Sequence, residues 1–151
     1  MNEDPTATGV DEAVLGRLAR QGDAEYLAQL VGVFVERAAS GTARALAAAA
    51  EHSLDEVRLA AQSLVFTAAS VGARRLQRAA EAIEQLAMAQ DSRALQRALR
   101  ELDAASAEAR SFVAAWHVGY AAASQPRSAT PARPAGPGGS TTPRRSRSTR
   151  P

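Results

Sequence analysis

The sequence contains no cysteine and no lysine, and only 4% of its 151 residues are aromatic. Without cysteine, disulfides, thiol catalysis and cysteine-type zinc sites are excluded. No apolar run approaches the roughly 20 residues that span a bilayer. The first residues, MNEDPTATG, are too acidic and polar for a secretory signal. We therefore expect a cytoplasmic protein without a membrane partner.

The net charge of +2 hides two segments of opposite sign. Residues 1–123 hold all 16 acidic residues and 12 arginines, a net charge of −4, whereas the tail, residues 124–151, holds six arginines and no acidic residue. The tail is rich in Pro, Gly and Ser and has no aliphatic side chain larger than alanine, so it cannot offset the entropy lost on ordering. We predict one folded domain, residues 11–123, between a disordered N-terminus, residues 1–10, and a disordered tail.

Within residues 11–123, apolar side chains recur every three or four residues, and no run alternates with period two. Helices are expected over residues 11–20, 24–50 and 54–70. Gly72 interrupts the pattern, a fourth helix follows it to about residue 89, and a last helix begins after Asp91. Asp23 and Asp91 are suitable N-caps. Ser53 is a further N-cap candidate, and Glu56 completes a capping box with it.

Each expected helix has one apolar side. The predicted core residues are Val14, Leu15, Leu18, Leu27, Leu30, Val31, Phe34, Ala38, Ala45, Val57, Ala61, Leu64, Ala68, Val71, Leu76, Ala80, Ile83, Leu86, Leu95, Leu99, Leu102, Ala109, Val113 and Trp116. Short connections between long helices imply antiparallel neighbours. The expected fold is all-α: an antiparallel up-down four-helix bundle with a short extra helix at its start.

Two segments resemble the histidine-containing phosphotransfer (HPt) domains of bacterial phosphorelays. The first is GDAEYLAQLVGVF, residues 22–34, which is similar to the family pattern GD-x-x-Y/F-L-x-x-L-V-x-x-F. The second is AQSLVFTAASVGARRL, residues 61–76, which is similar to A-H-S-L-K-G-S-A-A-N-V-G-A followed by leucine. The resemblance covers about residues 11–118 and implies a helical bundle in two-component signal transduction.

The departures from the family pattern fall on its functional positions. Gln62 stands where the family has its phosphoaccepting histidine, Val65 where it has lysine and Phe66 where it has glycine. A glutamine amide is neither basic nor nucleophilic at neutral pH, so it cannot accept a phosphoryl group as imidazole does. Val65 offers no charge to the phosphoryl oxygens, and Phe66 fills space that glycine leaves open.

Helical geometry at about 100° per residue places Gln62 opposite the apolar side of its helix. Val65 and Phe66 then lie within about 60° of Gln62, and Ala69 lies beside them. We predict an interface formed by Arg58, Gln62, Val65, Phe66 and Ala69, because compact exposed apolar patches often mark partner sites. The alternative is that Phe66 tilts into a groove and packs against a neighbouring helix.

The remaining candidate residues indicate no catalysis. His52 falls in a connection without the small residues that follow the family histidine, and His117 is expected near the end of the last helix, where an imidazolium meets the helix C-terminus favourably. Two separate histidines do not make a metal site, and no phosphate loop, nucleophile elbow or HExxH motif is present. We predict no enzyme activity, no metal and no cofactor.

The expected function is that of a degenerate HPt-like protein that docks a response-regulator receiver domain or a histidine kinase without relaying phosphate. The alternative is a helical-bundle adaptor outside phosphorelays that acts through its basic tail. The tail can bind acidic partners or nucleic acid by counterion release. However, the tail lacks aromatic residues for base stacking. We therefore expect no nucleic-acid partner, and only the tail could provide such a contact.

Overall fold

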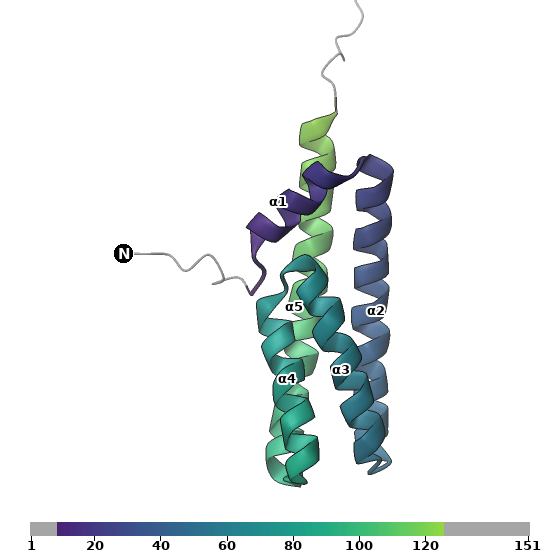
Figure 1. Cartoon of the computed structure of the whole chain (residues 1–151), viewed down its shortest axis with the longest axis vertical. Coiled ribbons are helices and arrows are strands. Elements are labelled where there is room, and N and C mark those ends of the chain that lie inside the picture. Colours follow the sequence, from purple (N-terminus) through teal and green to yellow (C-terminus); the bar gives the residue numbers. More distant parts are fainter. Residues whose placement is uncertain (1–8, 126–151) are drawn as a thin grey trace, which may run out of the picture.

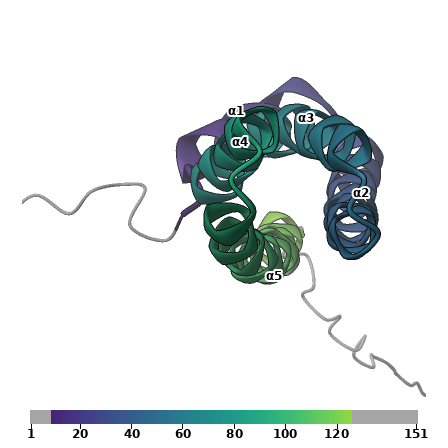
Figure 2. The ribbon, with the colours of Figure 1, turned by 90° about the horizontal axis from the view of Figure 1, so that it is seen from below.

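The computed structural model describes residues 9–125, and five helices form in this part of the chain. They are α1 (Glu12–Gln21), α2 (Ala24–Ala50), α3 (Leu54–Val71), α4 (Arg74–Ala89) and α5 (Ser92–Ser124). Helices α2 to α5 run alternately down and up (Figure 1). Seen from below, they form a ring in which α2 and α4 each lie beside α3 and α5 (Figure 2). The predicted antiparallel four-helix bundle with a short first helix is confirmed.

Aspartates begin three of these helices. The side chains of Asp11, Asp23 and Asp91 each accept a hydrogen bond from a backbone N–H two or three residues later. Ser53 is the N-cap residue of α3, as predicted, but the capping box is a correction, because the Ser53 side chain makes no capping hydrogen bond and no bond to Glu56 accompanies it among the described residues. Backbone N–H groups of the α2–α3 turn donate to the last carbonyls of α2 instead, so the turn is held without a side-chain cap.

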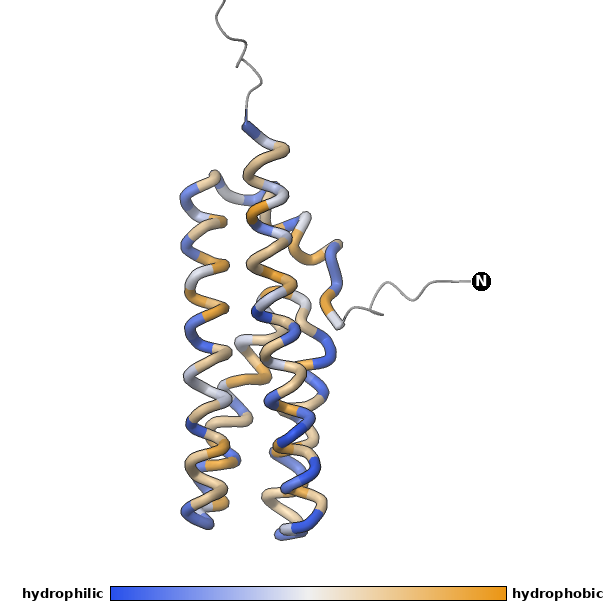
Figure 3. Tube along the Cα trace, turned by 180° about the vertical axis from the view of Figure 1, so that it is seen from behind, coloured by the Kyte–Doolittle hydropathy of each residue, from blue (hydrophilic) through white to orange (hydrophobic). Residues whose placement is uncertain are grey.

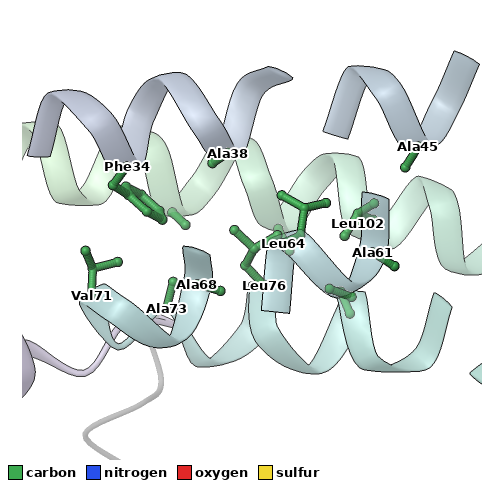
Figure 4. Close-up of a cluster of buried hydrophobic side chains, with 14 of the residues drawn as sticks. Phe34, Ala38, Ala45, Ala61, Leu64, Ala68, Val71, Ala73, Leu76 and Leu102 are labelled. Atoms are coloured by element: carbon green, nitrogen blue, oxygen red, sulfur yellow. The ribbon is translucent and has the colours of Figure 1, made fainter. Parts of the chain in front are cut away.

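The core consists of narrow apolar stripes in which alanine is the commonest residue. Most of the predicted core residues are buried. Four residues predicted to be in the core are only half-buried, at the border of their stripes, and correct that prediction: Leu18, Leu30, Leu86 and Trp116. Small side chains allow the helices to approach closely, so the few large residues, Phe34 among them, fill most of the remaining volume (Figure 4).

The helices differ greatly in length, and this gives the two ends of the bundle different characters. The 27-residue α2 and the 33-residue α5 extend beyond the 18-residue α3 and the 16-residue α4, and α1 crosses the bundle near that end (Figure 1). Hydrophilic residues are dense on the lower parts of α4 and α5, whereas the upper part of α5 is mainly apolar in colour (Figure 3).

The folded part begins earlier than predicted. Val10 is fully buried in the core, and the carbonyl of Gly9 accepts a 3.1 Å hydrogen bond from the backbone N–H of Arg75. The Arg75 side chain in turn donates to Glu101 on α5, with 2.7 Å between Nε and Oε1, and pairs with Glu108. The hydrogen bond from Arg75 lowers the pKa of the Glu101 carboxyl below its ordinary value. Residues 9 and 10 therefore belong to the domain rather than to a disordered N-terminus.

Gly72 joins α3 to α4 and holds α1 in place. Its φ is +75°, in the left-handed region that ends many helices, and its carbonyl accepts a 2.8 Å hydrogen bond from the backbone N–H of Asp11. A Cβ atom at this position would lie 2.9 Å from the Cβ of Val14. Only glycine allows α1 to pack this closely on the α3–α4 turn.

At the other boundary, α5 continues through Ser124, so the predicted tail starts inside the helix. The predictions of disorder for residues 1–8 and 126–151 lie outside the described residues. Within residues 9–125, no helix is both long and apolar enough to cross a membrane.

Thr42 carries a buried polar group without a partner. Its side chain is 3% exposed, and Oγ1 has no hydrogen-bond partner among the described residues. The carbonyl of Ala38, one turn earlier, instead accepts a 3.3 Å hydrogen bond from the buried Ser106 hydroxyl. The Thr42 hydroxyl therefore contributes its desolvation cost without a compensating bond.

Replacing Thr42 by valine is expected to raise the free energy of unfolding by about 1 kcal/mol, because an unpaired buried hydroxyl costs about 1–3 kcal/mol. Valine keeps the shape and a similar helix propensity. Urea denaturation measures the change, and Ser106→Ala, which removes a made hydrogen bond, is the control and should not stabilise. A destabilised Thr42→Val variant would mean that the hydroxyl is paired in solution.

Candidate functional site

Helix α3 presents one side to solvent in the middle of the molecule. Gln62, Phe66 and Ala69 are exposed at spacings of four and three residues, and they form one stripe along the helix. Arg58 continues this stripe towards the start of α3 and is half-buried. Val65, which we expected to face outward, is half-buried and packs against the core. The structure thus brings the five predicted interface residues to one side of α3, with Val65 at its inner edge.

Phe66 is the most exposed large apolar residue in the described part of the chain, with 73% of its surface accessible. It does not pack into the bundle, so the alternative of a buried Phe66 is not what the structure shows. Exposure of a whole aromatic ring leaves a large apolar area in water, and contacts with a partner would remove it. Phe66 is therefore the centre of the candidate site.

A groove of about 290 Å³ runs beside Phe66 between α2 and α3. Its lining consists of Leu30, Val33, Phe34 and Arg37 from α2 and Ser63, Phe66, Thr67 and Ser70 from α3. Phe34 is buried and forms part of the floor, whereas Val33 and Phe66 are exposed at the rim. The site is therefore an apolar groove with a projecting aromatic ring at one edge.

The polar groups of the groove differ in their availability. The hydroxyls of Thr67 and Ser70 donate to backbone carbonyls of α3 itself, at 3.0 Å and 2.7 Å. Arg37 is exposed and has no ion-pair partner within residues 9–125. Arg58, on the other side of Phe66, is half-buried and likewise has no ion-pair partner among these residues. Two unpaired cations therefore flank the apolar centre, and a carboxylate of a partner could meet either of them.

The position that the HPt resemblance gives to the phosphoacceptor holds no nucleophile. The Gln62 side chain makes no hydrogen bond to another described residue and offers only an amide, which is not a nucleophile. His52 is exposed in the α2–α3 turn with a φ of +59°. His117 lies on α5, two turns before the helix ends at Ser124, so the predicted contact with the helix C-terminus is wrong. No group of three or more potential metal ligands occurs among residues 9–125.

Sequence reasoning missed the α2 side of the site. Val33 and Arg37 lie four residues apart on α2, next to the core stripe formed by Val31, Phe34 and Ala38. The sequence did contain an indication of an exposed apolar site on α2, because Val33 is an apolar residue outside that stripe. Its position relative to Phe66 depends on how α2 packs on α3, which a single sequence does not specify.

Comparisons of this chain with family models, with curated proteins and with solved structures found no match. The likeness to HPt domains therefore depends on the two quoted segments, and the geometry around Phe66 and Gln62 has to support any function by itself.

Proposed function

We propose that this chain is an HPt-like protein of two-component signalling that docks a response-regulator receiver domain or a histidine kinase and modulates it by binding alone. The observation that carries the proposal is the exposed Phe66 ring beside Gln62 on α3. A ring that is 73% exposed is costly to keep in water. It therefore favours a role in which a partner covers it.

The surroundings of Phe66 support a protein partner rather than a small ligand. The groove is open along one side of the α2–α3 pair and has one projecting aromatic residue, Val33 at its rim and free arginines on both sides. Aromatic residues, phenylalanine included, and arginine are enriched in the cores of protein interfaces. A partner surface with an apolar centre and nearby carboxylates would complement this arrangement.

Gln62 supports binding without transfer. It lies on the exposed side of α3, where a partner that covers Phe66 would also cover it, yet its amide cannot carry a labile phosphoryl group. Such a protein would occupy the docking surface of its partner without passing on phosphate. The consequence would be competition with functional phosphotransfer proteins for the same receiver or kinase.

The proposal is tested by titrating the purified full-length protein with purified receiver domains and kinase transmitter domains from the same organism, using isothermal titration calorimetry. We expect one or a few of them to bind with 1:1 stoichiometry, and the bound receiver to receive phosphate more slowly from its usual donor. The absence of binding to every receiver and kinase domain would refute it.

Replacing Phe66 by alanine is expected to weaken binding of that partner by about 30-fold or more, because a hot-spot aromatic residue contributes 2 kcal/mol or more. The thermal stability should stay unchanged, since the ring packs on little of the core. Met88→Ala is the matched control, because Met88 on α4 is also exposed, at 57%, and lies far along the bundle. Equal losses for both variants would show that Phe66 is not at the interface.

The adaptor alternative predicts a different dependence. If the basic tail made the main contact, removal of residues 126–151 would abolish partner binding, and Phe66→Ala would leave it intact. The HPt-like proposal predicts that removal of residues 126–151 leaves binding of the receiver or kinase intact, and that Phe66→Ala weakens it. The two variants measured side by side therefore separate the two functions.

A further inference from the structure

Exposed apolar side chains extend from the groove beside Phe66 in two directions. Among residues 9–125, seven large apolar side chains are exposed, and four of them lie on one face of the α2–α3 pair. Tyr26 and Val33 lie on α2, 45% and 46% exposed, and Leu59 and Phe66 lie on α3, 46% and 73% exposed. Residues seven apart on a helix are two turns apart on nearly the same side. We call these four residues the α2–α3 strip.

The α2–α3 strip has two equivalent halves. Val33 and Phe66 line the same groove from opposite helices, and α2 and α3 run in opposite directions (Figure 1). Tyr26 precedes Val33 by seven residues, and Leu59 precedes Phe66 by seven residues, which is about 10 Å along either helix. Tyr26 and Leu59 therefore lie at equal distances on opposite sides of the groove, and the strip crosses diagonally from α2 to α3.

Two opposite charges lie next to the middle of the strip. Glu36 and Arg37 are adjacent on α2, and Arg37 lines the groove. Both side chains are exposed, and neither forms an ion pair within residues 9–125. The centre of this face therefore offers one acidic and one basic group to whatever covers it.

We propose that a second copy of this chain covers the α2–α3 strip, related by a two-fold axis that lies in the interface and crosses the groove at right angles to the strip. This rotation exchanges the two ends of the strip, so that Tyr26 meets Leu59 of the second copy and Leu59 meets its Tyr26. Each Phe66 ring enters the groove of the other copy. Glu36 and Arg37 lie near the axis, where each meets the opposite charge of the second copy.

The groove is large enough for a ring of the second copy. Its volume is about 290 Å³, whereas a cavity of about 150 Å³ already holds benzene. The buried Phe34 forms part of its floor, and Val33 forms the rim opposite Phe66. An inserted ring would therefore contact an aromatic floor and an apolar rim, and both exposed Phe66 rings would leave water in the same step.

The symmetry of the strip favours a second copy over other occupants. A small molecule in the groove would leave Tyr26 and Leu59 in water, because each lies about 10 Å away along its helix. A two-fold interface uses the same patch on both molecules, so that patch has to be complementary to itself. The equal seven-residue spacings and the neighbouring opposite charges of Glu36 and Arg37 meet this requirement.

Self-association would regulate the docking surface, because the dimer covers Phe66 and Gln62 beside it. A receiver or kinase would then bind only the monomer, so a higher concentration of this protein would withdraw its own docking sites. This regulatory consequence rests on the proposed function, whereas the dimer itself does not.

The first test is sedimentation velocity of the full-length protein over a wide range of concentrations. The strip is smaller than a standard interface of about 20–30 residues a side, so we expect a reversible dimer with a dissociation constant of about 10–100 µM. Leu59→Asp should weaken the dimer by at least about tenfold, because each dimer loses two apolar contacts. Met88→Asp is the matched control, since Met88 is 57% exposed on α4, outside the strip, and it should leave the dimer unchanged.

A charge exchange tests the two-fold relation itself. Glu36→Arg and Arg37→Glu should each weaken the dimer by about tenfold, because each replaces two attractive contacts by two repulsive ones. The double variant Glu36→Arg, Arg37→Glu exchanges the charges and should restore dimerisation, since the opposite charges meet again in the reverse sense. A double variant as weak as the single variants would place these residues away from the axis.

Disulfide cross-linking tests which residues meet, and it is unambiguous because the sequence contains no cysteine. A mixture of the Tyr26→Cys and Leu59→Cys proteins should form a cross-linked dimer on mild oxidation. Either protein alone should cross-link much more slowly, because like ends of the strip lie about 20 Å apart in the proposed dimer, and a disulfide needs Cα atoms within about 7 Å. A mixture of Met88→Cys with Leu59→Cys is the control and should not cross-link preferentially.

Three outcomes overturn the proposal: a protein that stays monomeric well above the expected dissociation constant, a dimer that Leu59→Asp leaves intact, and equal cross-linking of the test and control mixtures. A protein that stays monomeric yet binds a receiver or kinase through Phe66 would assign the strip to that partner alone. A dimer with the expected cross-links that binds no receiver or kinase, even as the monomeric Leu59→Asp variant, would refute only the proposed function.

Discussion

Replacing Phe34 by alanine is expected to lower the free energy of unfolding by about 3–5 kcal/mol, the range for a buried phenylalanine. Phe34 is 2% exposed and is the largest of the fully buried side chains. It points from α2 towards Ala68, Val71 and Ala73 (Figure 4). Small neighbours such as Ala68 and Ala73 cannot extend into the space that the ring would leave, so we expect a cavity rather than a collapse.

The matched control is the same substitution at Phe66, on the other side of the same groove. Phe66→Ala removes an exposed ring, so its effect on stability should stay within about 0.5 kcal/mol. Urea denaturation with a two-state fit measures both variants. If Phe34→Ala and Phe66→Ala lowered the free energy of unfolding by similar amounts, Phe66 would be part of the core. The docking proposal would then lose its main support. If Phe34→Ala had little effect, the alanine-rich core would be able to repack.

The pattern of Val57, Ala61, Leu64, Ala68 and Val71 was sufficient to predict which side of α3 is buried, since helical periodicity depends only on local spacing. The N-caps at Asp23 and Asp91 were predictable for the same reason. The position of Ser53 as N-cap of α3 was predictable too, but the absence of its capping hydrogen bond was not, because that bond depends on the conformation of the turn.

Features that depend on contacts between distant segments were not predictable. Leu30 has the spacing of a core residue but is only half-buried and lines the groove between α2 and α3. Val10 belongs to the core because the segment around Gly9 is held over the start of α4 by Arg75, and nothing in the local sequence indicates that contact. For the same reason, the exposure of Phe66 remained open in the sequence and was decided by packing.

Restoring phosphotransfer is expected to need three substitutions rather than one. Gln62→His alone supplies a nucleophile, but the exposed Phe66 ring still limits how closely a phosphorylated receiver can approach, and Val65 provides no charge. Transfer needs reacting atoms about 3–3.5 Å apart, and a misplacement of about 1 Å can cost about a hundredfold in rate. We therefore expect Gln62→His, Val65→Lys, Phe66→Gly to accept phosphate at least about a hundredfold faster than the single variant.

The bundle should tolerate these changes. A lysine at position 65 can cover the core with its aliphatic stem, as the half-buried Val65 does, while its ammonium group reaches solvent. Glycine at position 66 costs about 1 kcal/mol in helix propensity relative to alanine, and it removes a ring that contributes little to the core. Circular dichroism of the triple variant should therefore show a folded helical protein before its activity is measured.

The measurement is intact mass at neutral pH after incubation with the phosphorylated form of a receiver that binds the natural protein. The natural protein is the control and should gain no phosphate, although it contains His52 and His117, because neither lies beside Phe66. Rapid transfer to the single variant would show that Phe66 does not obstruct the approach. A folded triple variant that binds the receiver but stays unphosphorylated would mean that the partner docks in a different orientation. The Gln62 position would then not face the partner's phosphoryl group, and the proposed HPt-like mode of docking would fail even though Phe66 still bound a partner.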